Sequence, residues 1–116
     1  MDRRFKTENL RIKNQIEKID NISMEIITLI GINKIVPQEN YKEKLRDLGI
    51  KLCEEASKYG YCCTQHGTLR NKQFEKYKWH LENISVYEVT LIKIMSDVFK
   101  MIDKDEYFYK NCIDEE

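Results

Sequence analysis

The segment Cys62-Cys63-Thr64-Gln65-His66 holds the densest group of side chains that could bind a metal or react as nucleophiles. A structural zinc site needs four ligands, commonly supplied as paired Cys or His spacings. Two adjacent cysteines do not easily bind one tetrahedral ion, and the remaining ligands would have to come from distant residues. We therefore favour small, partly buried thiols at a turn. A metal or redox role for Cys62, Cys63 and His66 is the weakest of three functional hypotheses.

Glu88 is an acid at a position where helical periodicity predicts an apolar side chain. In a continuous helix it would lie between Ile84 and Leu91 on the buried face, and burying an unpaired carboxylate costs several kcal/mol or more. Such an acid could serve a ligand, a cation of a partner, or a second copy of the chain. We favour two simpler alternatives: a helix starts at Ser85 and Glu88 completes its capping box, or the bundle flares and Glu88 reaches solvent.

Trp79 falls on the side of its predicted helix opposite the apolar face, close to Lys72 and Lys76. An outward-facing Trp is costly unless something covers it, and Trp is enriched at the centres of protein interfaces. The cover is either a partner or the tail of the same chain, whose aromatic residues are Tyr107, Phe108 and Tyr109.

The stretch 69–80 mixes basic and aromatic residues, a pattern that can bind single-stranded nucleic acid through phosphate contacts and base stacking. Its cations are Arg70, Lys72, Lys76 and Lys78, and the first helix adds Arg3 and Arg4. Phe74 and Tyr77 are needed in the core, which leaves only Trp79 to stack on bases. The whole chain has 20 basic and 20 acidic residues, without the basic excess typical of nucleic-acid binders. A solvated helix face is the favoured interpretation.

The sequence also narrows the class of protein. It has no Gly-rich phosphate loop, no His-Glu-x-x-His motif and only two histidines, so we expect neither an enzyme nor a cofactor. The start of the chain lacks the apolar core of a secretory signal, and the longest apolar run, 26–32, is too short to span a bilayer. We therefore expect a cytoplasmic protein with free thiols and no membrane partner.

Three long segments with helical periodicity must position these residues. They span about 2–30, 37–59 and 68–103, and an acidic, aromatic tail follows at 104–116. Gly31 and Gly60 are expected to end the first two helices, and Thr68 to cap the third. The pattern predicts a single all-α domain over 1–116, an antiparallel bundle of three helices. The alternative is four helices, with the third segment broken near residue 84.

An internal resemblance bears on that choice. Residues 21–30 and 83–92 align without gaps and share six of ten residues, Asn-Ile-Ser followed by Thr-Leu-Ile. A duplicated helix or chance in a biased composition explains the match equally well. Because 21–30 lies inside an uninterrupted periodic run, the alignment slightly favours a continuous third helix through 83–92.

The leading functional hypothesis is a helical protein that binds another protein, as an adaptor, inhibitor or regulatory subunit. Residues 22–30, together with Val86, Val89, Ile94 and Met101, form more apolar surface than three helices would bury. A homodimer would be an economical way to cover it, and short helical inhibitors of this size are a class that phages and other mobile elements encode. The candidate partner-binding residues are Trp79, Lys72, Lys76, Glu88 and Val86. Nucleic acid is the second choice of partner.

Overall fold

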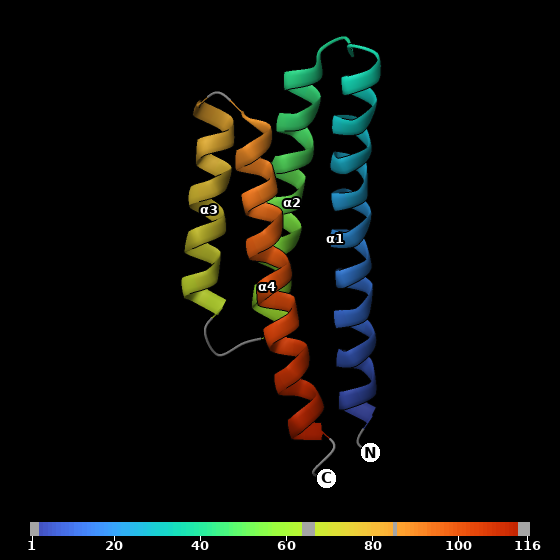
Figure 1. The fold of residues 1–116 in the computed structure, drawn as a ribbon. Helices are drawn as coiled ribbons and strands as arrows, with labels where there is room; N and C mark the ends of the chain where they lie inside the picture. The colour runs from blue at the N-terminus through green and yellow to red at the C-terminus, as the bar shows by residue number, and fades with distance from the viewer. Residues whose placement is uncertain (1–2, 64–66, 85, 114–116) are drawn as a thin grey trace.

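The computed structural model describes residues 3–63, 67–84 and 86–113, with side chains described for 10–60, 72–84 and 86–103. It contains four helices, α1 (Arg3–Ile35), α2 (Tyr41–Cys63), α3 (Gly67–Asn83) and α4 (Glu88–Ile113) (Figure 1). Successive helices run in opposite directions. The prediction of an all-α antiparallel bundle is confirmed. The preference for three helices was wrong, and the four-helix alternative is confirmed.

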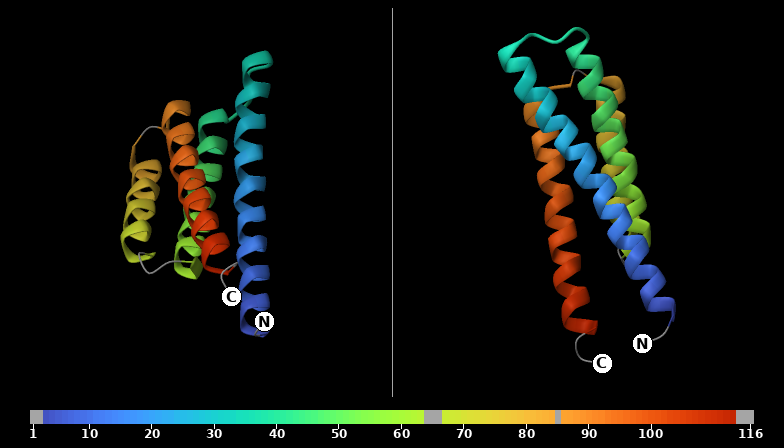
Figure 2. Two further views of the ribbon diagram at one scale, coloured as in Figure 1. Left: turned by 60° about the horizontal axis from the view of Figure 1, so that its bottom comes forward. Right: turned by 90° about the vertical axis from the view of Figure 1, so that its right-hand side faces the viewer.

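The second helix is central to the arrangement. Its most extensive contacts are with α3 and α1, whereas α4 approaches α2 and α1 closely over shorter stretches (Figures 1 and 2). Helix α1 ends, α2 begins, α3 ends and α4 begins at one end of the bundle, which we call the upper end. Helix α1 begins and α4 ends together at the lower end.

A single hydrophobic core receives side chains from all four helices. On α2 the buried face is formed by Leu45, Leu52, Ala56 and Tyr59, each at most 1% exposed. The helical spacing of three and four residues places them on one side of the helix. The other helices contribute Ile19, Ile26, Ile30, Phe74, Leu81, Leu91, Ile94, Met95, Val98 and Ile102.

Neither of the expected glycine stops ends a helix. Helix α1 continues through Gly31 to Ile35, and α2 continues through Gly60 to Cys63. A glycine that ends a helix usually adopts a left-handed backbone, but no described glycine has a positive φ. The penalty for a glycine inside a helix is only about 1 kcal/mol relative to alanine, which the packing of both helices against the core outweighs.

The connection between α1 and α2 is fixed by local hydrogen bonds. The Gln38 backbone N–H donates to Asn33 Oδ1 at 2.8 Å. Asn40 has a positive φ of 55°, and its carbonyl accepts the first α2 bond, from Lys44 N, at 3.0 Å. Pro37 has no backbone N–H to continue α1. The chain therefore reverses here, four residues later than predicted for the start of α2.

The third periodic segment breaks after Asn83. Ile84 N still donates to the His80 carbonyl at 2.8 Å, and the first bonds of α4 run from Thr90 N and Leu91 N to the Tyr87 carbonyl. The residues 21–30 are thus one continuous helix, whereas the similar residues 83–92 cross a break. The preference for a continuous helix was therefore wrong. The break allows the Val86 side chain to enter the core. Ser85, the predicted cap, lies outside the described residues.

Gly49 sits where α2, α3 and α4 approach one another. A Cβ at this position would lie 2.5 Å from Leu91 Cδ2 and 2.9 Å from Leu81 Cδ1. Real carbon atoms do not approach so closely, so only glycine fits without movement of the two leucines.

A buried amide links α1 to α2. Gln15 Nε2 donates to the Glu55 backbone carbonyl at 3.0 Å and also contacts the Glu55 carboxylate. Burial acts to raise the pKa of Glu55, but the hydrogen bonds from Gln15 and Lys58 outweigh it, and the net shift is downward. The carboxylate is therefore held in its charged form.

Candidate binding surfaces

The exposed large apolar side chains of the described residues are unevenly distributed. Apart from Leu10, they fall in two stretches, 24–36 and 79–92, both in the upper half of the bundle (Figure 1). Single exposed apolar residues are ordinary on protein surfaces, whereas neighbouring ones mark interaction sites. The residues are Met24, Ile27, Ile32, Ile35, Val36, Trp79, Ile84, Tyr87, Val89 and Ile92.

The first candidate surface is a stripe along α1, formed by Met24, Ile27, Gly31 and Ile35, which we call the α1 stripe. Spacings of three and four residues place these positions on one side of the helix. The side chains of Met24, Ile27 and Ile35 are 61%, 53% and 84% exposed. The buried residues of α1, which include Ile26 and Ile30, lie on a different side of the helix, so the stripe is exposed to solvent.

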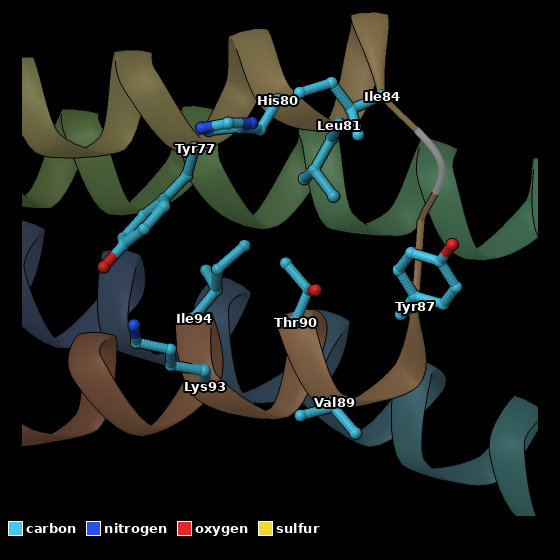
Figure 3. A pocket seen from close by; sticks show the side chains of 9 residues that line it. All are labelled: Tyr77, His80, Leu81, Ile84, Tyr87, Val89, Thr90, Lys93 and Ile94. Atoms are coloured by element: carbon cyan, nitrogen blue, oxygen red, sulfur yellow. The ribbon is translucent and has the colours of Figure 1, made fainter.

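The second candidate surface is a groove between α3 and α4, with a volume of about 360 Å³ (Figure 3). Leu81 and Ile94, each 1% exposed, lie at its base. Thr90 and Ile94 point from α4 towards α3 in Figure 3, and Tyr87 lies near the connection between the two helices. The lining residues of this α3–α4 groove are Tyr77, His80, Leu81, Ile84, Tyr87, Val89, Thr90, Lys93 and Ile94.

A hydrogen-bonded tyrosine joins the two helices beside the groove. The Tyr77 hydroxyl donates to Asp97 Oδ2 at 2.6 Å and accepts from Gln73 Nε2 at 2.9 Å. Burial and the bond to Asp97 raise the pKa of Tyr77. The phenol therefore keeps its proton and donates it in the hydrogen bond to Asp97. Within the described part of the chain, the side chains of His80 and Lys93 make no hydrogen bond or ion pair, which leaves them free to contact a bound group.

Trp79 lies on the outer side of α3 and is 55% exposed. Its only ring contact is edge-on with His80, at 5.5 Å between centroids, among the described residues. The backbone of residues 107–109 belongs to α4 near the lower end, whereas Trp79 is one turn from the upper end of α3, so the structure places these residues at opposite ends of the bundle (Figure 1). Lys72 and Lys76, also exposed, precede Trp79 on the same side of the helix.

The structure places the other two predicted partner-binding residues differently. Val86 is 5% exposed and packs in the core, so its side chain is not available to a partner. Glu88 is the first residue of α4 and half-buried, and its Oε1 accepts a hydrogen bond from the Tyr41 hydroxyl. Burial, followed by this bond, raises the pKa of Tyr41 to about 12. The less favoured hypothesis, an unpaired acid on a continuous helix, is therefore wrong. Of the favoured alternatives, a new helix does begin in this region, but at Glu88 and not at Ser85, which lies outside the described residues.

The basic residues do not form one surface. Lys78 Nζ pairs with Glu54 Oε1 on α2 at 3.0 Å, and this bond raises the pKa of Lys78. The first turns of α1 and α3, where Arg3, Arg4 and Arg70 lie, are on opposite sides of the bundle (Figures 1 and 2). The side chains of these arginines lie outside the described residues.

The cysteine cluster also falls largely outside the described side chains. Only the helical backbone is described for Cys62 and Cys63, and His66 is not described at all. Among the described residues, no group of three or more His, Cys, Asp or Glu is placed to hold a metal ion. Cys53 is buried, and burial, together with the charge of Glu54, raises the pKa of its thiol to about 12.

The chain matches no protein-family model, and no curated protein or solved structure is significantly similar to it. Its class is therefore defined by the fold alone, as an up-and-down bundle of four helices. No helix in the described part of the chain is long and apolar enough to cross a membrane. The sites to explain are the α1 stripe and the α3–α4 groove.

Proposed function

We propose that the protein acts by binding another polypeptide through the apolar surfaces of its upper half, as an adaptor, inhibitor or regulatory subunit. One observation carries the proposal. After four helices have packed, Ile35 and Val89 are still 84% and 78% exposed, with other large apolar side chains beside them. Exposed apolar surface of this kind is costly in water and is found where proteins bind partners.

The two surfaces suit different elements of a partner. The α1 stripe is a ridge on a long helix, so it fits the apolar face of another helix. The α3–α4 groove is a depression with apolar walls, so it fits inserted side chains, as in recognition of an amphipathic helix. Lys93 lines the groove and favours a partner that carries an acidic side chain beside its apolar anchors.

Binding of nucleic acid receives less support. Of the four basic residues predicted on α3, Lys78 is already paired with Glu54. The basic first turns of α1 and α3 are separated by α2 and α4 (Figure 2). A nucleic-acid strand would therefore have to wrap around the bundle to touch both, against a net charge of zero.

The test is quantitative affinity capture from the host with matched variants. Ile27→Glu alters the α1 stripe, Val89→Glu alters the rim of the α3–α4 groove, and Ser96→Glu adds the same charge to an exposed site on α4 that is in neither surface. We expect at least one of the two surface variants to lose a captured protein by tenfold or more. The Ser96→Glu control should still capture that protein. The wild-type chain should also still capture it from extract that has been treated with nuclease. Equal capture by all four proteins, or loss on nuclease treatment, would contradict the proposal.

A further inference from the structure

Gly31 has no role in the packing of the chain that contains it. A Cβ built at this position meets no atom within 4 Å. Its backbone is helical and has no positive φ, so the backbone does not need glycine either. Glycine inside a helix is destabilising relative to alanine. The glycine therefore costs stability relative to alanine, and no contact within the described part of the chain requires glycine at this position. By contrast, a Cβ at Gly49 would force Leu91 and Leu81 to move.

The place of Gly31 in the α1 stripe supplies a reason for it. It lies between Ile27 and Ile35, four residues from each, and all three positions share one side of α1. A position without a side chain allows a second helix backbone to approach closely, and the two isoleucines would pack on either side of the crossing point.

The pattern is symmetric about Gly31, as a two-fold interface requires. In an antiparallel pair centred on Gly31, Ile27 of one copy lies opposite Ile35 of the other, and the reverse contact is identical. Between residues 24 and 36 the only charged side chains are Glu25 and Lys34. In this register they face residues 37 and 28, which are Pro37 and Thr28, so no like charges oppose each other.

We propose that the polypeptide covering the α1 stripe is a second copy of this chain, with the two α1 helices antiparallel and crossing at Gly31. This inference rests on the proposed function, since it names the partner of one of the two surfaces. It makes Gly31 a residue that lowers the stability of the monomer and improves the contact between two copies.

The first experiment measures self-association by analytical ultracentrifugation. We expect Gly31→Ala to raise the melting temperature of the dilute, monomeric protein and to weaken dimerisation at least tenfold, because the added methyl group separates the helices. Asn21→Ala, an exposed substitution on α1 away from the crossing point, should leave the dimer unchanged. A wild-type chain that stays monomeric, or a Gly31→Ala variant that dimerises as tightly as wild type, overturns the inference.

The second experiment tests the register by disulfide trapping. Ile27→Cys and Ile35→Cys are made separately, in a background where Cys62, Cys63 and Cys112 are replaced by serine. The antiparallel pair predicts a disulfide between residue 27 of one chain and residue 35 of the other when the two proteins are mixed and oxidised. Predominant 27–27 and 35–35 disulfides, or no crosslinking, contradict the proposed geometry.

The two proposals fail in different ways. Suppose that the wild-type chain is monomeric at every concentration and that Ile27→Glu still abolishes capture of a host protein. The proposed self-association is then wrong, and the proposed function stands. If capture is also insensitive to both Ile27→Glu and Val89→Glu, the proposed function fails as well.

Discussion

The Tyr41 hydroxyl donates a hydrogen bond to Glu88 Oε1, so the first residue of α2 is tied to the first residue of α4. A second tyrosine–carboxylate bond, from Tyr77 to Asp97 at 2.6 Å, ties α3 to α4. Helix α4 follows the break near residue 84, and its close approaches to the other helices are less extensive than those between α2 and α3. These two bonds therefore add to the core packing of Leu91, Ile94 and Val98 in holding α4 on the bundle.

Removing the Tyr41–Glu88 bond should destabilise the protein. Tyr41→Phe keeps the ring and deletes the donor, and we expect it to lower the free energy of unfolding by about 1 kcal/mol. Glu88→Gln keeps an acceptor and should cost less. A double-mutant cycle measured by urea denaturation should give a coupling of about 0.5–1.5 kcal/mol between the two sites. Strictly additive effects would show that the bond contributes nothing.

The burial of Tyr41, together with the same bond, predicts a loss of stability at high pH. The pKa of Tyr41 is about 12 in the folded protein, against an ordinary value of 10.0. A raised folded pKa means that the stabilisation is fully present below pH 10 and is lost as the pH rises from 10 to 12. The stability difference between wild type and Tyr41→Phe should therefore shrink over this range. Denaturation curves at pH 9, 10 and 11 measure it, and a difference that grows with pH would be the wrong sign.

The two glycines inside α1 and α2 should respond oppositely to alanine. Gly49→Ala forces Leu91 and Leu81 to move within a packed core, which costs about 1–3 kcal/mol and exceeds the gain in helix propensity. Gly31→Ala meets no atom and should raise the free energy of unfolding of the monomer by up to about 1 kcal/mol. Chemical denaturation at low protein concentration compares them. Destabilisation by Gly31→Ala would mean that its surroundings are not open.

Cys53 should be unreactive in the native protein. Its thiol is buried and its pKa is raised to about 12, so almost no thiolate is present or accessible near neutral pH. Iodoacetamide labelling followed by mass spectrometry of the Cys53 peptide should show modification only when urea unfolds the chain. Rapid labelling under native conditions would indicate that the α2–α3 contact opens readily.

Ser23 should be replaceable without loss. Its side chain is 2% exposed, and its Oγ has no hydrogen-bond partner among the described residues. Ser23→Ala removes an unsatisfied buried group and improves helix propensity, so we expect a gain of about 0.5–1.5 kcal/mol in the free energy of unfolding. Thermal and urea denaturation both test this. A clear loss of stability would reveal a bond that Ser23 makes in solution.

Helical periodicity was enough to predict the class of fold. The spacing of Leu45, Leu52 and Tyr59 determines which side of α2 is apolar, and that side is buried. The helix ends were harder to predict. Gly31 and Gly60 carry a local penalty that contacts with other helices outweigh, and such contacts are not encoded in a short window of sequence.

The sites were predicted less well than the fold. The periodicity indicated excess apolar surface, and Val89 is exposed, but Ile94, Met101 and Val86 are buried because α4 begins a new helix with its own phase. The partner of Glu88 lies 47 residues away on α2, so no local pattern could have identified it. The α3–α4 groove depends on how two helices lie relative to each other, which periodicity does not determine.

The even number of helices has a practical consequence for experiments on this protein. Because α1 begins at Arg3 and α4 ends at Ile113, both at the lower end, these two positions lie at the opposite end of the bundle from Ile35 and Tyr87 (Figures 1 and 2). An affinity tag, a fluorescent label or attachment to a sensor chip can therefore be placed at either terminus. The proposed contacts at the opposite end would then stay sterically accessible during the measurement.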